Sequence, residues 1–168
     1  MEVMTTTDAL RPSEAFLESF RRHGAGIAVV TLRKKDGSPT GFIATSLASL
    51  SANPPVATFN MAQTASSWTS VSVDTPILIH LLSVDNVDLA KKIAGESDQR
   101  FDGDHWHEGP DGLPLLKGVH AWMSATVVAI TEVEFSAMVA ARITGGALGE
   151  LSTPLVYSER DYRAVTSL

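Results

Sequence analysis

The sequence predicts a mainly β protein, built as an antiparallel barrel with a few flanking helices. Short apolar runs rich in β-branched residues recur along the chain and are separated by turns of Gly, Pro, Asp and Asn. Only three short segments have helical character, and strands and helices do not alternate in a regular way. A parallel, doubly wound sheet is therefore disfavoured, and a closed or partly closed antiparallel barrel is favoured.

Each expected element has a local signal. Pro12 opens a helix with an apolar stripe that Gly24 ends, and the Asp36-Gly37 turn connects two strands as a hairpin. Thr64 and Asp85 are expected helix caps. The predicted elements are a helix from Pro12, strands at 27–33, 40–46 and 56–61, a short helix at 64–73, a strand at 76–82, a helix at 86–94, a long excursion at 96–117, strands at 118–131 and 133–144, a Gly-rich turn at 145–149 and a short segment at 154–157.

Composition limits the functional classes. The 168 residues fit a flexible tail at 1–11 and one domain at 12–168, and the net charge of −6 argues against nucleic-acid binding. With no cysteine, the chain cannot form disulfides, thiolate nucleophiles or iron–sulfur clusters. No run reaches the ~18 apolar residues of a membrane span, and Met1–Leu10 is too polar for a signal peptide. We therefore expect a cytoplasmic protein that does not bind membranes.

A segment rich in small hydroxyl residues, Gly41–Pro55, is the main functional signal. Small side chains let a flat ligand approach the backbone, and hydroxyl and N–H groups can then hydrogen-bond its polar edge. A second hydroxyl-rich turn, Gln63–Ser67, precedes Trp68 at an expected helix start, where free N–H groups would suit a phosphate. The alternative is that both are turns whose hydroxyls satisfy their own backbone.

Two other motifs are weaker indications of function. Gly24-Ala-Gly26 precedes a strand, which is the wrong order for a dinucleotide fingerprint, so any nicotinamide nucleotide must bind without a Rossmann site. His105 and His107 stand in a mixed loop without a metal-site spacing, so no metal site is expected.

Several segments taken together resemble the flavin reductase-like family, whose fold is the FMN-binding split barrel, an antiparallel Greek-key barrel. The resemblance covers roughly residues 12 to 163. The resemblance rests on the segments Ala28–Thr31, Gly41–Pro55, Arg100–Phe101, Gly112–Leu115 and Pro154–Tyr157, together with Tyr162.

The resemblance implies hydride transfer from NAD(P)H to FMN or FAD, with FMN as the first choice of cofactor and no catalytic side chain required. It also implies a homodimer and, as a further partner, a monooxygenase component that takes reduced flavin. The cofactor-binding residues implied by the resemblance are Ala44, Thr45, Ser46, Ser49, Ala62, Gln63, Ser66, Ser67, Arg100, Phe101 and Tyr162.

One departure from the family pattern leaves alternatives open. Reductase relatives commonly have Gly-Asp-His where this chain has Glu134-Phe135-Ser136. The second reading is therefore a flavin- or heme-binding split-barrel protein without NAD(P)H reductase activity. The third is a dimeric interaction domain without a ligand.

Overall fold

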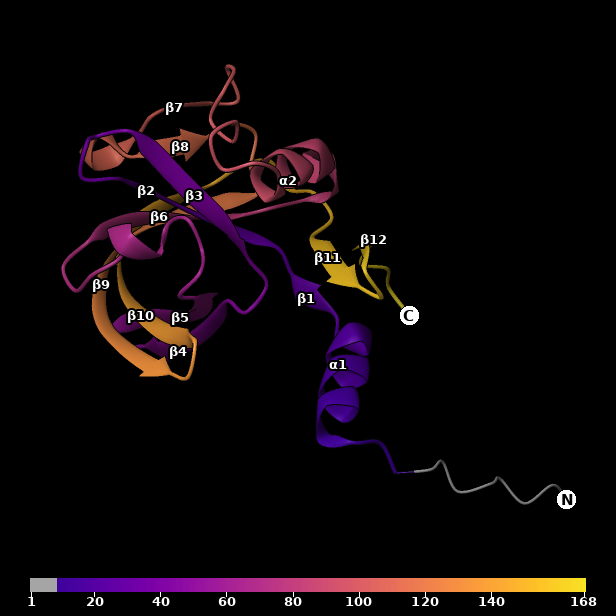
Figure 1. Ribbon diagram of the computed structural model, residues 1–168. Coiled ribbons are helices and arrows are strands. Elements are labelled where there is room, and N and C mark those ends of the chain that lie inside the picture. The colour runs from indigo at the N-terminus through magenta and orange to yellow at the C-terminus, as the bar shows by residue number, and fades with distance from the viewer. Residues whose placement is uncertain (1–8) are drawn as a thin grey trace, which may run out of the picture.

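A curved antiparallel sheet of seven strands forms the centre of the computed structural model, which describes residues 9–168 (Figure 1). The strand order across the sheet is β3-β2-β6-β9-β10-β5-β4, and all pairings are antiparallel. The strands are β2 (Ala28–Arg33), β3 (Pro39–Ala44), β4 (Ala48–Ala52), β5 (Pro55–Ala62), β6 (Pro76–Leu81), β9 (Ala121–Val133) and β10 (Ser136–Leu148). The predicted mainly β fold is confirmed. The predicted tail lies outside the described residues except for 9–11.

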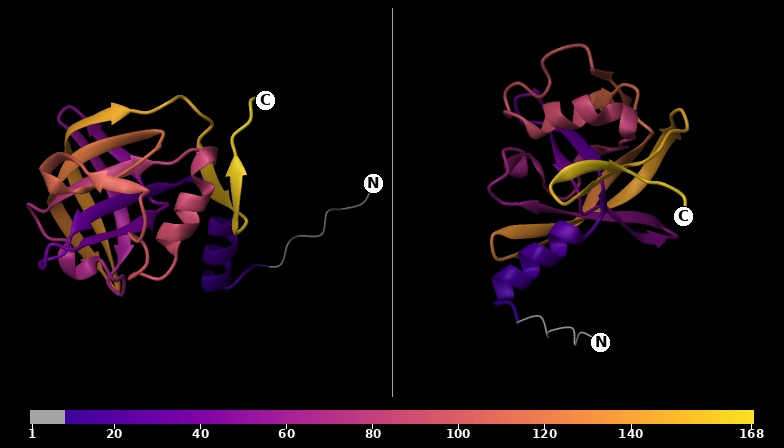
Figure 2. Two further views of the ribbon diagram at one scale, coloured as in Figure 1. Left: turned by 90° about the horizontal axis from the view of Figure 1, so that it is seen from above. Right: turned by 90° about the vertical axis from the view of Figure 1, so that its right-hand side faces the viewer.

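The remaining elements lie around this sheet. A three-stranded sheet, β1-β11-β12, stands beside the barrel next to helix α1, which projects away from the barrel (Figure 2). None of the helices described from residue 9 onward has the length and apolarity needed to cross a membrane. These elements are α1 (Pro12–Arg22), β1 (Ala25–Gly26), η1 (Trp68–Ser70), η2 (Val84–Asn86), α2 (Val87–Ala94), β7 (Trp106–Glu108), η3 (Pro110–Gly112), β8 (Pro114–Leu116), β11 (Leu155–Ser158) and β12 (Asp161–Ala164).

Strand β2 is buried on both faces, which explains its uninterrupted apolar sequence. Successive side chains of a strand point to opposite faces. Val30 and Leu32 pack inside the barrel in one cluster with Phe59 of β5. Val29 packs on the outer face in a second cluster that contains Ile93 of α2. The sheet therefore has a core on each side.

Strands β3 and β5 do not pair in the sheet. Hydrogen bonds of side-chain hydroxyls connect this side of the barrel instead. Ser46 Oγ accepts a hydrogen bond from the Asn60 N–H at 2.7 Å. The hydroxyls of Thr40 and Ser67 hydrogen-bond each other at 2.8 Å, and both residues are buried. We call the line marked by these two contacts the seam.

Two helix predictions are corrected. Residues 64–73 do not form a helix, and only Trp68–Ser70 make a turn of 3₁₀ helix. Ser and Thr side chains compete for backbone hydrogen bonds, which disfavours a regular helix here. Asp85 is not the cap of the next helical segment. Ser83 is, because its hydroxyl accepts from the Asp85 N–H.

Three strand predictions also change. Residues 48–52, expected to belong to a turn, form edge strand β4, and Pro55 pairs with Ala52 as the first residue of β5, a position that tolerates proline. Residues 145–148 continue β10 past a bulge instead of turning. There Gly146 is required, because a Cβ on it would lie 2.4 Å from the Trp122 carbonyl oxygen. Near the C-terminus, Asp161–Ala164 form β12.

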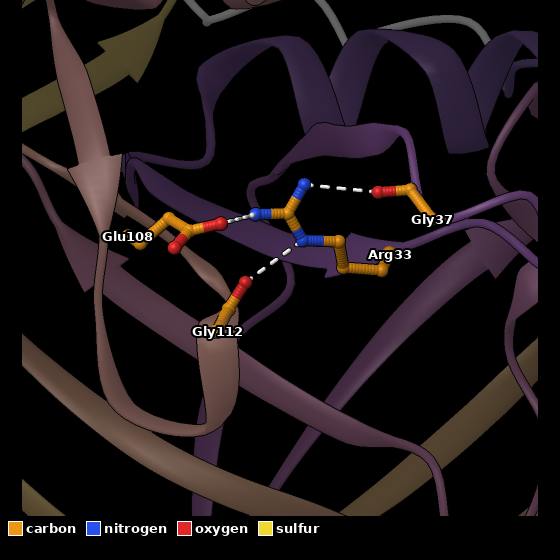
Figure 3. Close-up of polar contacts among 4 residues, drawn as sticks. All are labelled: Arg33, Gly37, Glu108 and Gly112. Atoms are coloured by element: carbon orange, nitrogen blue, oxygen red, sulfur yellow. Dashed lines mark hydrogen bonds and ion pairs between the residues drawn. The ribbon is translucent and has the colours of Figure 1, made fainter.

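The excursion at 96–117 is tied to the barrel by side chains of β2. Arg33 donates from Nε to the Gly112 carbonyl at 2.8 Å and from Nη1 to the Gly37 carbonyl at 2.9 Å, and it pairs with Glu108 at 3.1 Å (Figure 3). The buried Thr31 hydroxyl donates to the Pro114 carbonyl at 2.6 Å. This excursion, which includes β7 and β8, is therefore an ordered cover over one end of β2.

His80 joins three strands inside the fold. Its Nε2 lies 3.1 Å from the Leu116 backbone N–H, which can only donate, so the Nδ1 carries the ring proton and donates to the Val29 carbonyl at 3.1 Å. Burial lowers the pKa of His80 to about 4 from its ordinary value of 6.5. The neutral ring is thus the form that fits this site.

We predict that acid destabilises the protein through His80. Because the unfolded chain takes up a proton near pH 6.5 and the folded chain only near pH 4, the free energy of unfolding should fall by about 3 kcal/mol over that interval. Urea unfolding at several pH values should show this slope in the wild type, and His80→Gln should flatten it. Equal slopes in the two proteins would show that the folded state does not hold His80 neutral.

Candidate functional site

The predicted flavin segment lies at the seam, and its hydroxyls face outward. Thr45 and Ser49 are exposed, Ser46 is half-buried, and Ala44 is buried at the end of β3. Thr45 and Ser46 line a cavity of about 440 Å³ whose other walls are α1, Ala25 and residues 157–160. We call it the helix-side cavity. The bend at 44–49 is therefore open, as a ligand site there requires.

Thr45 and Ser46 have different roles. The Ser46 hydroxyl is engaged by Asn60 and holds the seam. No hydrogen bond within residues 9–168 occupies the Thr45 hydroxyl, so it can bind a ligand in the helix-side cavity.

Ser49 lines a second cavity of about 270 Å³, which lies between the paired strands β4 and β5 on one side and Leu81, Met123 and Ile143 on the other. Leu47 separates this cavity from a third, of about 320 Å³, whose wall includes Ile27, Leu82 and His120. The His120 Nδ1 is buried without a hydrogen-bond partner in the described part of the chain. The flavin segment thus has a cavity on each side. The Thr45 hydroxyl and the His120 Nδ1 at these cavities have no hydrogen-bond partner among residues 9–168.

The second hydroxyl-rich turn is held by the β9–β10 hairpin. The Gln63 N–H donates to the Phe135 carbonyl at 2.9 Å, and its side-chain amide donates to Glu132 at 3.2 Å. Ala62 and Ser66 are exposed. Ser67, in contrast, is fully buried and its hydroxyl contacts Thr40, so the residue holds the seam and presents no exposed group to a ligand.

Positive charge reaches this second turn from the β2–β3 hairpin, which the sequence did not reveal. The chain has no Lys or Arg between Lys35 and Lys91. A cavity of about 280 Å³ lies between Lys34–Asp36 and Thr69–Ser70. The two lysines therefore stand across this cavity from the end of η1, which directly follows the turn that is expected to hold a phosphate.

Arg100 and Phe101 anchor a loop. Arg100 donates to the Gly41 carbonyl at 2.8 Å and to the Gly95 carbonyl at 3.0 Å. Phe101 packs edge-on against Trp106. A Cβ on Gly41 would lie 2.8 Å from the Val30 carbonyl oxygen and 3.1 Å from the Phe101 ring, so Gly41 lets the two segments approach closely. Neither Arg100 nor Phe101 lines the helix-side cavity. Their predicted contact with a cofactor stays a prediction.

Tyr162 is half-buried on β12, and its ring meets Tyr157 edge-to-face at 5.5 Å. Burial raises the pKa of Tyr162, which keeps its hydroxyl neutral. The tyrosine that lines the helix-side cavity is Tyr157, together with Leu17 and Phe20 of α1. The apolar stripe of α1 was the signal that could have pointed to this wall.

The helix-side cavity fits a flat ring with a polar edge. Its volume is in the range of small-molecule sites, and it combines an apolar wall with the free Thr45 hydroxyl. Its charged residues are Arg21, Glu159 and Arg160. Arg21 is paired with Glu18 at 3.0 Å. Among residues 9–168, no group of three or more His, Asp or Glu side chains is arranged to hold a metal ion.

Comparison with known proteins identifies the family and agrees with the fold. The family model "Flavin reductase like domain" matches residues 20–166. The chain belongs to this family. It is 37% identical over 155 residues to an NADH:FMN oxidoreductase of Rhodococcus qingshengii, covering 89% of this chain and 80% of that one. It is 30% identical over 129 residues to the reductase component of the flavin-dependent trigonelline monooxygenase of Acinetobacter baylyi, covering 77% of this chain and 42% of that longer protein.

A solved structure is also similar to this member of the flavin reductase family. The crystal structure of a flavin reductase domain protein from Arthrobacter sp. FB24 superposes with a TM-score of 0.89 and is 42% identical, covering 93% of this chain and 97% of that chain. The family predicted from the sequence is therefore confirmed.

We predict that the Thr40–Ser67 pair stabilises the seam. Thr40→Val and Ser67→Ala each leave a buried hydroxyl without its partner and should lower the free energy of unfolding by about 1–3 kcal/mol. A double-mutant cycle in urea should give a coupling energy of about 1 kcal/mol. The exposed Thr144–Ser124 pair is the matched control and should show a coupling near zero. Equal coupling in the two pairs would contradict a special role of the seam.

Proposed function

We propose that this protein transfers hydride from NADH or NADPH to FMN, with FAD as the alternative acceptor, and supplies reduced flavin to a monooxygenase component. The main support for this proposal is the exposed bend at Thr45, which lies beside a cavity with an apolar wall. The 37% identity to an NADH:FMN oxidoreductase supports it as well. In this reaction a hydride would pass from the dihydronicotinamide to the flavin and one proton would come from solvent, giving NAD(P)⁺ and reduced flavin.

The protein's own residues would contribute binding and orientation. Thr45 and the neighbouring backbone would hold the polar edge of the ring, and Ser66 with the free N–H groups of its turn would hold the phosphate. Leu17, Phe20 and Tyr157 would exclude water from the ring. Since solvent would supply the single proton that accompanies the hydride, no side chain has to act as acid or base.

The β9–β10 turn is where this chain departs from the pattern expected of reductases. Phe135 is 80% exposed at the turn, and its carbonyl holds Gln63. The turn therefore still supports the predicted phosphate-binding residues although it has no histidine. Flavin binding without NAD(P)H oxidation is the competing function that an assay must separate.

We predict that the protein oxidises NADH or NADPH in the presence of FMN or FAD, followed at 340 nm. Thr45→Val should raise the Kd for FMN about fivefold, because one hydrogen bond of about 1 kcal/mol is lost, and Thr144→Val should leave it unchanged. Fluorescence titration gives the Kd. Flavin binding without oxidation of either nucleotide would favour the competing function. Absence of flavin binding would leave only an interaction domain.

We also infer a homodimer in the cytoplasm, where nicotinamide nucleotides are available. Helix α1 has no buried residue, and the side chains of Phe16, Leu17 and Phe20 are 61%, 60% and 61% exposed. The Phe16 and Phe20 rings pack against each other in a tilted arrangement, with centroids 4.7 Å apart, and form one continuous apolar face. Such a face on a helix that projects from the barrel needs a partner, and a second copy of the chain supplies one.

We predict a particle of about twice the 17.9 kDa chain mass in multi-angle light scattering. Phe16→Glu should give a monomer, because it places a charge in the centre of the α1 face. Val133→Glu, at another exposed apolar residue, is the control and should remain dimeric. A wild-type monomer would contradict the proposed homodimer.

A further inference from the structure

The turn between β11 and β12 forms one wall of the helix-side cavity and has an uncommon backbone. Glu159 and Arg160 connect the paired residues Ser158 and Asp161, and both have left-handed backbones, with φ of 51° and 62°. Two-residue turns of this kind favour Asn-Gly, because a side chain destabilises the left-handed conformation. Backbone strain of this kind is found most often at ligand-binding and active sites, so the turn is a candidate for a binding role.

Arg160 brings an unpaired positive charge to this wall. No ion pair with Arg160 is present within residues 9–168, whereas Arg21 in the same cavity is neutralised by Glu18. Glu159 also lines the cavity, and its backbone N–H donates to the Arg21 carbonyl at 2.7 Å. This contact fixes the turn against α1, so that Arg160 is held at the cavity beside Thr45.

The expected site of the flavin phosphate is at the other end of β3. Ser67 contacts Thr40 near the start of this strand, and Thr45 follows its last residue. Five residues of extended strand separate the two ends by about 16 Å. A single phosphate cannot reach both Ser66–Ser67 and Arg160, so an anion at Arg160 belongs to a second ligand.

We propose that Arg160 binds a phosphate of the nicotinamide nucleotide in the helix-side cavity. This inference rests on the proposed function and assigns a specificity residue to it. A guanidinium forms strong, paired hydrogen bonds with phosphate, and a partly enclosed cavity strengthens them. The contact holds the donor nucleotide beside Thr45, where the ring of the flavin is expected.

The first test is a binding measurement. Protein saturated with FMN is titrated with ADP-ribose, which carries the phosphates without the reducing ring, and calorimetry follows binding. Arg160→Asn keeps a residue that tolerates the turn and should raise the Kd about tenfold. Arg160→Lys should restore part of the affinity, and Glu159→Gln should lower the Kd, because it removes a negative charge from the same wall. Arg163→Gln, which does not line the cavity, should match the wild type.

The second test is kinetic. Arg160→Asn should raise the KM for NADH about tenfold but leave kcat/KM for 1-benzyl-1,4-dihydronicotinamide, which has no phosphate, unchanged. Arg160→Gly should raise the KM for NADH as well while raising the Tm, because glycine removes the backbone strain. A structural role of the arginine would lower the Tm instead.

Three outcomes decide between the hypotheses. Wild-type affinity for ADP-ribose in Arg160→Asn would overturn the inference. An increase in the Kd for FMN instead would assign the site to the flavin phosphate and also overturn it. If the wild type oxidises neither nicotinamide, the proposed function fails, and the ADP-ribose titration alone decides whether Arg160 binds a nucleotide phosphate.

Discussion

Closure of the barrel by two side-chain contacts instead of a backbone ladder is the constraint on which the rest of the structure depends. Strands β3 and β5 do not pair. Ser46, just after β3, contacts Asn60 of β5, and Thr40 of β3 contacts Ser67 in the loop that follows β5. An unpaired strand edge leaves backbone N–H and carbonyl groups free for other partners. The two hydroxyl-rich segments lie along the seam, so the place where the sheet has no ladder is also the place with polar groups available to a ligand.

Basic side chains lie near both ends of strand β3. The chain carries a net charge of −6, yet the basic residues Lys34, Lys35 and Arg160 line cavities at the two ends of β3. Local positive charge on an acidic surface concentrates phosphate-bearing ligands at those ends without binding nucleic acid in general. Two separate basic ends suit a reaction with two phosphate-bearing nucleotides.

Sequence patterns predicted the strands with strong periodicity and the hydroxyl bend at 44–49, because both signals are local. The predictions that were wrong concern segments whose structure depends on contacts with distant parts of the chain. Residues 48–52 become a strand only because β5 folds back on them, and 145–148 stay in β10 because β9 continues beside them. For the same reason Tyr157 and Arg160 were missed as cavity residues. They reach Thr45 only through the pairing of β1 with β11, in which the paired residues are 130 and 132 positions apart.

The two sides of the site therefore rest on different parts of the fold. The seam and the second hydroxyl turn belong to the seven-stranded barrel, whose packing fixes them. The wall with Tyr157 and Arg160 belongs to the small β1-β11-β12 sheet beside α1. The departures from the expected sequence, at Glu134–Phe135 and Glu159–Arg160, fall on hairpin turns outside the core. Changes there leave the barrel core untouched, whereas Thr40 and Ser67 are buried and hydrogen-bonded within it.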